Sequence, residues 1–100
     1  MIRHIVMWKV RGVTQQERVD ARRRVKHAFE TLRGRIPGLT HVEVGMDVGV
    51  ADHACDLVLV SDFDSPDALA AYADHPEHLR VRAELDGLRI ERHQVDYITD

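Results

Sequence analysis

The sequence predicts one α+β domain over residues 1–100, with its elements in the order β-α-β-β-α-β. Three observations lead to this prediction. Four stretches, residues 2–10, 39–47, 56–63 and 88–98, carry the two-residue alternation or dense β-branched content of strands. Two stretches between them carry helix-start signals and apolar stripes. Finally, 100 residues of which 44% are hydrophobic suffice for one modest core.

Residues 2–10 are expected to form the first strand, with bulky apolar groups on both faces. One face carries His4, Val6, Trp8 and Val10, and the other carries Ile5, Met7 and Lys9. A helix should follow a turn at residues 11–13, because Thr14 stands three residues before Glu17 in a capping-box pattern. Its apolar stripe consists of Val19, Val25, Ala28, Phe29 and Leu32. Arg18, Arg22, Arg23 and Lys26 are expected to point largely outward, and Gly34 to end the helix.

The middle of the chain predicts two further strands. A turn at residues 36–38 precedes strand 39–47, whose apolar side carries Val42, Val44 and Met46. Residues 48–54 should form a loop. Strand 56–63 is apolar on both faces, which indicates burial on both sides.

The second helical region contains a break. Ser65 and Pro66 are a typical N-cap and first helical residue. Because Pro76 lacks an amide hydrogen and disfavours helical geometry at His75, the helix should end near residue 74 and a new one should begin at Pro76. That helix should stop near Gly87, and residues 88–98 should form the last strand.

This order of elements predicts a ferredoxin-like fold, with a four-stranded antiparallel sheet and both helical regions on one face. The apolar residues on the other face of the first and third strands would then be exposed in a monomer. Such a patch is unusual, so we expect a homodimer formed through the sheet face. Any ligand would lie between sheet and helices.

Composition excludes several classes of protein. A net charge of −3 gives no bulk attraction to nucleic acid or to an anionic membrane. The lone Cys55 rules out an internal disulfide. The apolar residues 1–10 are too few for a secretory signal or a membrane span, so a cytoplasmic protein is expected.

The stretch around the proline break is the candidate site. His78 falls in the first turn of a helix, where the partial positive charge of free amides favours a neutral, proton-accepting imidazole. Tyr72 could present a phenol to the same space. The alternative is structural: Asp74 or His75 caps the helix, Tyr72 packs half-buried, and His78 is simply polar.

Landmarks along the whole chain resemble the stress-responsive A/B barrel (Dabb) family. They are Ile2-Arg3-His4-Ile5-Val6, Ile36-Pro37-Gly38-Leu39, Phe63-Asp64-Ser65, Tyr72 with His75-Pro76-Glu77-His78, and Val95-Asp96-Tyr97. The resemblance implies a dimeric α+β barrel. Similarity to the olivetolic acid cyclase-like members, which are polyketide cyclases, implies His78 as general base, Tyr72 as its hydroxyl partner and His4 as an orienting cavity residue. The second key histidine of those enzymes falls at Leu57 here.

A small aromatic or polyketide-like molecule is the expected ligand, and no cofactor is expected. The ligand-binding residues would be Val6, Trp8, Phe29, Leu59, His75 and Val81. Because leucine can neither donate nor accept a hydrogen bond, Leu57 favours the alternative of a non-catalytic stress-response or accessory dimer. A cofactor-free monooxygenase is a third possibility, by analogy of fold alone.

Other signals are weaker. His75 and His78, with His4 or Asp74, could bind a metal, but no established metal motif is present. Haem bound through His78 or His93 is disfavoured by the size of the chain. Cys55 with His53 lacks a third orienting group, and the basic run Arg22–Lys26 is better explained as a solvated helix face.

Overall fold

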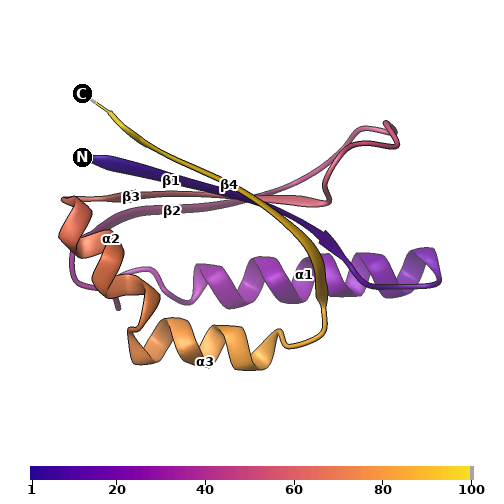
Figure 1. Cartoon of the computed structure of the whole chain (residues 1–100). Helices are drawn as coiled ribbons and strands as arrows, with labels where there is room; N and C mark the ends of the chain where they lie inside the picture. Colours follow the sequence, from indigo (N-terminus) through magenta and orange to yellow (C-terminus); the bar gives the residue numbers. More distant parts are fainter. Residues whose placement is uncertain (100) are drawn as a thin grey trace.

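The computed structural model describes residues 1–99 and contains a four-stranded antiparallel sheet with helices on one face (Figure 1). The elements are β1 (Ile2–Val10), α1 (Gln15–Glu30), β2 (Leu39–Met46), β3 (Leu57–Phe63), α2 (Pro66–Ala73), α3 (Pro76–Glu84) and β4 (Arg89–Ile98). The strand order is β2-β3-β1-β4. The predicted ferredoxin-like fold is therefore confirmed, with the second helical region split into α2 and α3.

Local sequence signals set the ends of the helices. The Thr14 hydroxyl accepts a hydrogen bond from the Glu17 amide at 3.1 Å, and the Glu17 carboxylate accepts one from the Val13 amide at 2.9 Å. Thr14 therefore caps α1 as predicted, with Glu17 bound to the amide of the residue before the cap. The helix ends at Glu30, earlier than the predicted Gly34, and residues 31–35 form a tight turn.

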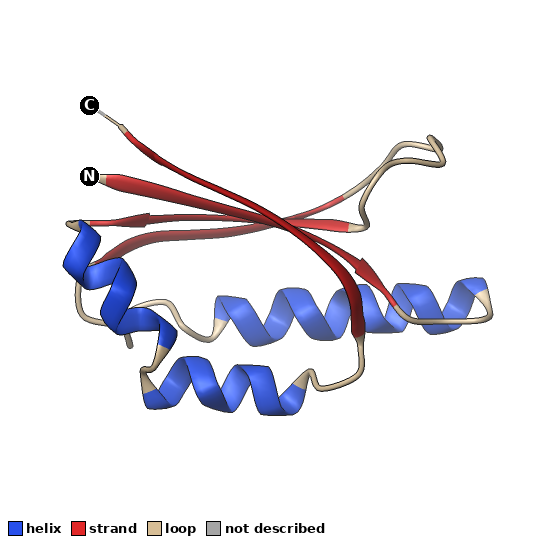
Figure 2. Cartoon of the chain, in the orientation of Figure 1, coloured by secondary structure: helices blue, strands red, loops and turns tan. Residues whose placement is uncertain are grey.

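The break at Pro76 is also where it was predicted. His75 has extended geometry (φ −65°, ψ 137°), and its Nδ1 accepts a hydrogen bond from the Glu77 amide at 3.1 Å. The chain therefore bends between α2 and α3, and α2 lies across one end of the sheet while α3 runs beside α1 (Figure 2). The bend brings the end of α2 against the start of α3, which is the region of the candidate site.

The core fills the space between the sheet and the helices. It contains Val6, Trp8 and Val10 of β1, Leu57, Leu59 and Phe63 of β3, Ala21, Val25, Ala28, Phe29 and Leu32 of the α1 region, and Val81 and Leu85 of the α3 region, among others. Gly38 has φ +80°, and a Cβ atom there would lie 2.6 Å from the Cβ of Ala68. The turn before β2 therefore needs glycine, because this close approach seats α2 on the sheet.

Two basic residues of α1 are not outward, contrary to the prediction. Arg22 donates to the Asp56 carboxylate through Nε at 3.1 Å, and Asp56 also accepts from the Val10 amide at 2.8 Å. Lys26 donates through Nζ to the Val44 carbonyl at 2.8 Å. These two long side chains join the helix to β2 and to the start of β3, whereas Arg23 and Arg24 of the same basic run are exposed.

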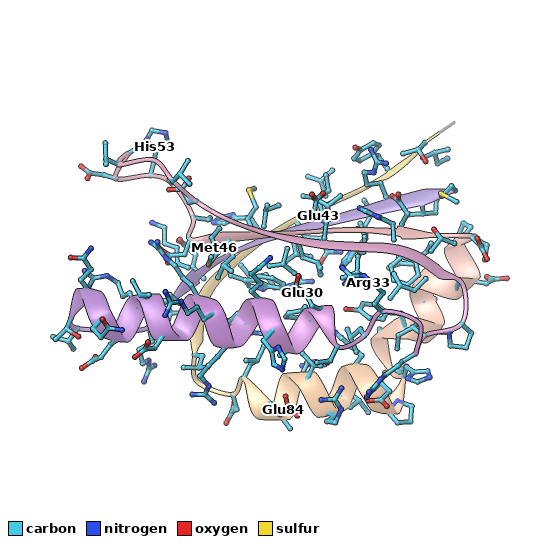
Figure 3. The ribbon with its side chains drawn as sticks, turned by 180° about the vertical axis from the view of Figure 1, so that it is seen from behind. Glu30, Arg33, Glu43, Met46, His53 and Glu84 are labelled. Carbon is cyan, nitrogen blue, oxygen red and sulfur yellow. The ribbon has the colours of Figure 1, made fainter. Side chains whose placement is uncertain are left out.

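The face of the sheet opposite the helices is uncovered in a single chain. Its apolar members are Ile5 and Met7 of β1, Val58 and Val60 of β3, and Val95 and Tyr97 of β4, which the pairing registers place side by side. Arg3 and Asp62 form a bidentate pair on the same face, at 2.9 and 3.2 Å. In Figure 3, Glu43 lies on the strand layer, and His53 lies at the tip of a loop that projects beyond the sheet. We call this surface the open face.

Candidate functional site

A cleft of about 550 Å³ opens between the helix face of β1 and β4 and the bend that joins α2 to α3. Of the predicted site residues, those in its wall are His4, Val6, Trp8, Phe29, Leu59, Tyr72 and His78. The remaining wall residues are Ala73, Arg82, Arg89, Ile90, Glu91 and Arg92. The cleft is therefore aromatic and apolar at its base and basic along β4 and α3.

Two predicted ligand-binding residues lie outside this wall. His75 caps α3, and its Nδ1 is engaged by the Glu77 amide. Val81 is fully buried in the core. Both residues were predicted to contact a ligand. In the structure, the proline bend places His75 at the N-cap of α3, and the orientation of α3 buries Val81 in the core.

Tyr72 and His78 meet across the bend. Their ring centroids are 4.2 Å apart, with an angle of 37° between the planes. His78 Nδ1 lies 3.0 Å from the Ala73 carbonyl oxygen. Because a carbonyl only accepts hydrogen bonds, Nδ1 carries the proton, and in the neutral ring Nε2 is the free acceptor.

Burial keeps both groups in forms suited to proton transfer. Loss of solvation is the largest cause that lowers the pKa of His78 below 6.5, opposed by the bond to Ala73 and assisted by the charges of Arg82 and Arg89. Burial also raises the pKa of the Tyr72 phenol well above its usual value. At neutral pH the pair therefore consists of a neutral imidazole and a protonated phenol. Burial is thus the main cause of the neutral His78, ahead of the helix N-terminus invoked from the sequence.

His4 approaches the same region from β1. Its Nδ1 lies 2.5 Å from Oδ1 of Asp96, the residue opposite it in the β1–β4 pairing. A carboxylate accepts at this position, so Nδ1 donates and Nε2 is left for other partners. The His4 ring lies edge-on to that of Tyr72, with centroids 6.1 Å apart. The sequence marked Asp96 as part of the family landmark Val95-Asp96-Tyr97 in the last strand, but its pairing with His4 depends on the strand register.

Three arginines of the wall were also missed from the sequence. Arg82 comes from α3, and Arg89 and Arg92 come from β4. The Arg89 guanidinium lies 5.3 Å from the centroid of the Trp8 ring and 5.5 Å from that of Phe29, and these two rings stack at 4.8 Å. A run of mixed polar residues along the last strand gave no signal of which side chains would face the helices.

The other signals from the sequence lie elsewhere. Leu57 is buried in the core, on the same face of β3 as Leu59, which lies in the wall of the cleft. Cys55 and His53 line a separate hollow at the far end of β2 and β3. Within residues 1–99, no three His, Cys, Asp or Glu side chains gather closely enough to hold a metal ion. None of the described helices is long and apolar enough to cross a membrane.

A family model described as the stress responsive A/B barrel domain (Dabb) matches residues 2–99. The chain belongs to this family. A dimeric protein of ferredoxin-like fold from Bacteroides fragilis, whose function is unknown, is 32% identical with a TM-score of 0.84, over 96% of this chain and 93% of that one. The family predicted from the sequence landmarks is therefore confirmed. No functionally curated protein matches the sequence.

Two more distant structures share the fold of this chain and carry an activity in their names. A hydroxynitrile lyase from Passiflora edulis is 21% identical with a TM-score of 0.78, over 99% of this chain and 93% of that one. A cofactor-independent oxygenase from Streptomyces nogalater is 14% identical with a TM-score of 0.74, over 99% and 92%. At these identities the similarity shows the fold alone.

Proposed function

We propose that this protein binds a small aromatic or polyketide-like molecule in the cleft and performs acid-base chemistry of the cyclase or lyase type on it. The observation that carries the proposal is the meeting of His78 and Tyr72 at the cleft, one with a free basic nitrogen and the other with a protonated hydroxyl. Within residues 1–99, the Tyr72 hydroxyl has no hydrogen-bond partner and remains available to a ligand.

Each polar group has a distinct part in this chemistry. His78 Nε2 takes the proton from a carbon next to a carbonyl group, and the Tyr72 hydroxyl donates a hydrogen bond to the carbonyl oxygen as negative charge develops there. His4, held through Nδ1 by Asp96, orients the substrate with its remaining nitrogen. The apolar base formed by Val6, Trp8, Phe29 and Leu59 accommodates the body of the molecule.

We further propose that two copies associate through the open face. The apolar side chains of β1, β3 and β4 on that face have no covering element within the described chain, and an uncovered apolar sheet face favours association. The related protein from Bacteroides fragilis is described as dimeric. Because the cleft lies on the opposite side of the sheet, each copy would keep its own site.

Acetophenone, a small aromatic ketone, provides a direct test. In D₂O the protein should accelerate exchange of its methyl hydrogens, followed by proton NMR. Tyr72→Phe and His78→Gln should lower that rate by about 100-fold. His53→Gln, at the tip of the projecting loop, is the matched control and should exchange like the wild type.

The alternative is a non-catalytic stress-response or accessory dimer, which the buried Leu57 favours. Trp8 is the only tryptophan of the chain and lies in the cleft wall, so its indole NMR signal reports occupancy. If acetophenone shifts this signal while exchange stays at the uncatalysed rate, the cleft binds without catalysis and the alternative holds.

A further inference from the structure

We propose that the cleft selects anionic ligands: Arg82, Arg89 and Arg92 bind a carboxylate or phosphate group attached to a planar body. This inference rests on the proposed function, because it names the class of molecule that the same cleft takes. The three guanidinium groups come from two elements and line one cavity together with the rings of Trp8 and Phe29.

A bulge in the sheet brings two of these arginines to the same side. Arg92 lies opposite Trp8 in the β1–β4 pairing, and Trp8 faces the helices. The register then shifts between Lys9 and Val10, so that Arg89 lies opposite Val10, which also faces the helices. Without this shift, strict alternation would place Ile90 opposite Val10 and Arg89 on the open face. The irregularity therefore places a second positive charge in the cleft.

The arginines have no carboxylate partner of their own. Glu91 also lines the cleft, but its carboxylate pairs with Lys9 at 3.5 Å and with His93 at 3.8 Å. Glu84 pairs with Arg80 at 2.8 Å. No ion pair or side-chain hydrogen bond joins Arg82, Arg89 or Arg92 to another residue of the described chain, 1–99. Asp86 lines a neighbouring hollow with Arg82 and Arg89 but forms no ion pair with either.

Such an arrangement is unfavourable until an anion arrives. Arg89 is partly buried, and burial is the first cause that lowers its pKa, followed by repulsion from Arg82 and Arg92. Stacking against Trp8 and Phe29 offsets part of the cost of burying the Arg89 charge, since cations are attracted to aromatic faces. Stacking does not explain why Arg82 and Arg92 converge on the same cavity. An anionic ligand would relieve the repulsion, and guanidinium groups are suited to bidentate contact with carboxylate and phosphate.

The anion site lies next to the proposed chemistry. The charges of Arg82 and Arg89 act on His78, and those of Arg89 and Arg92 act on Tyr72. A ligand anchored by its anionic group would therefore have its planar body beside the base and the phenol. Charge would set its orientation above the apolar base formed by Val6, Trp8, Phe29 and Leu59.

The test uses three naphthalene probes that differ in one substituent: 2-naphthoate, 2-naphthyl phosphate and the neutral 2-naphthamide. Binding to the wild-type protein is followed by the Trp8 indole signal in NMR titrations. At least one of the two anionic probes should bind about 10-fold to 100-fold more tightly than the amide, as expected for a hydrogen bond to a charged group. The stronger of the two identifies the carboxylate or the phosphate as the natural anion.

Variants connect this preference to the arginines. Arg92→Gln should lower the ratio of the anion affinity to the amide affinity by about 10-fold, and the Arg82→Gln, Arg92→Gln double variant should lower it further. Arg92 is chosen because it is exposed, so its replacement should not disturb folding. Arg89→Gln would also remove a side chain that stacks on Trp8 and Phe29. Arg23→Gln, exposed on α1 outside the cleft, is the matched control and should keep the full preference.

The possible outcomes distinguish failure of the anion site from failure of the proposed small-molecule binding. The anion site is ruled out if the amide binds as tightly as both anions. It is also ruled out if the preference for the anion is unchanged in both Arg92→Gln and the Arg82→Gln, Arg92→Gln double variant. In either case the proposed binding of a small molecule in the cleft is unaffected. If none of the three probes shifts the Trp8 signal, the inference and the proposed binding function both fail.

Discussion

His4 and Asp96, 92 residues apart in the chain, lie opposite each other on β1 and β4 and share a 2.5 Å contact between Nδ1 and Oδ1. The side chain of His4 is almost fully buried at the edge of the cleft, so its orientation depends on this one carboxylate. The contact joins the first and last strands at the point where the candidate site is formed.

Removal of this carboxylate should destabilise the protein. Asp96→Ala leaves a buried imidazole N–H without an acceptor, and we expect a loss of about 1–3 kcal/mol in the free energy of unfolding. Urea denaturation followed by circular dichroism measures it. Asp52→Ala, in the exposed loop between β2 and β3, should change stability by less than about 0.5 kcal/mol. Equal effects of the two substitutions would show that the contact carries no special energy.

His78 should make stability depend on pH in a defined direction. Because its pKa is lowered in the folded protein, the unfolded chain binds a proton first as the pH falls below about 6.5. Its contribution to stability is therefore complete above that pH and is lost progressively as the pH falls toward the folded-state pKa.

Guanidinium denaturation at pH 5 and pH 7 tests this dependence. His78→Gln should reduce the difference in stability between the two pH values. His53→Gln, which changes an exposed imidazole, should keep the difference of the wild type. A larger difference in His78→Gln than in the wild type would mean that the sign of the shift is opposite to the one described.

The contact of Arg22 with Asp56 should be a structural one. Arg22→Ala removes a charged hydrogen bond between α1 and the start of β3, at a partly buried position, and we expect a cost of about 2 kcal/mol. Arg23→Ala, one residue along the same helix and exposed, is the control with little expected effect. Thermal denaturation compares the two variants. Equal melting temperatures would show that Arg22 contributes no more to stability than an exposed residue of the helix.

Disruption of the open face should separate the proposed dimer. Val60 lies opposite Ile5 near the middle of the sheet, so Val60→Glu places a charge in the centre of the expected interface. Sedimentation equilibrium should then report the mass of one chain, where the wild type reports two. Val13→Glu, in the exposed turn before α1, should leave the mass unchanged. A wild-type protein that sediments as a monomer would contradict the proposed association.

Much of the fold was predictable because its signals are local. The N-cap at Thr14, the proline break at residue 76 and the alternation along β1 and β3 each depend on neighbours a few residues apart. Backbone sterics, helix capping and side-chain period act over that range. The predicted order of elements and the apolar base of the cleft followed from them.

The polar half of the site depended on contacts that local sequence does not specify. Strand alternation shows that Asp96 and Arg92 share a face, but only the β1–β4 register shows that they face His4 and Trp8. Arg89 joins them through a bulge, which reverses the face that strict alternation would assign. Arg22 likewise finds Asp56 through the packing of α1 on the sheet.

By itself, then, the sequence determined the order of elements and the bend between α2 and α3. It gave the meeting of Tyr72 with His78 as one of two alternatives, because six residues across a proline bend can meet through local geometry. Only the tertiary structure decided which charges surround that pair. The reason is physical: strand register and bulges are set by the balance of packing over the whole sheet, and a shift of one residue turns a side chain to the other face.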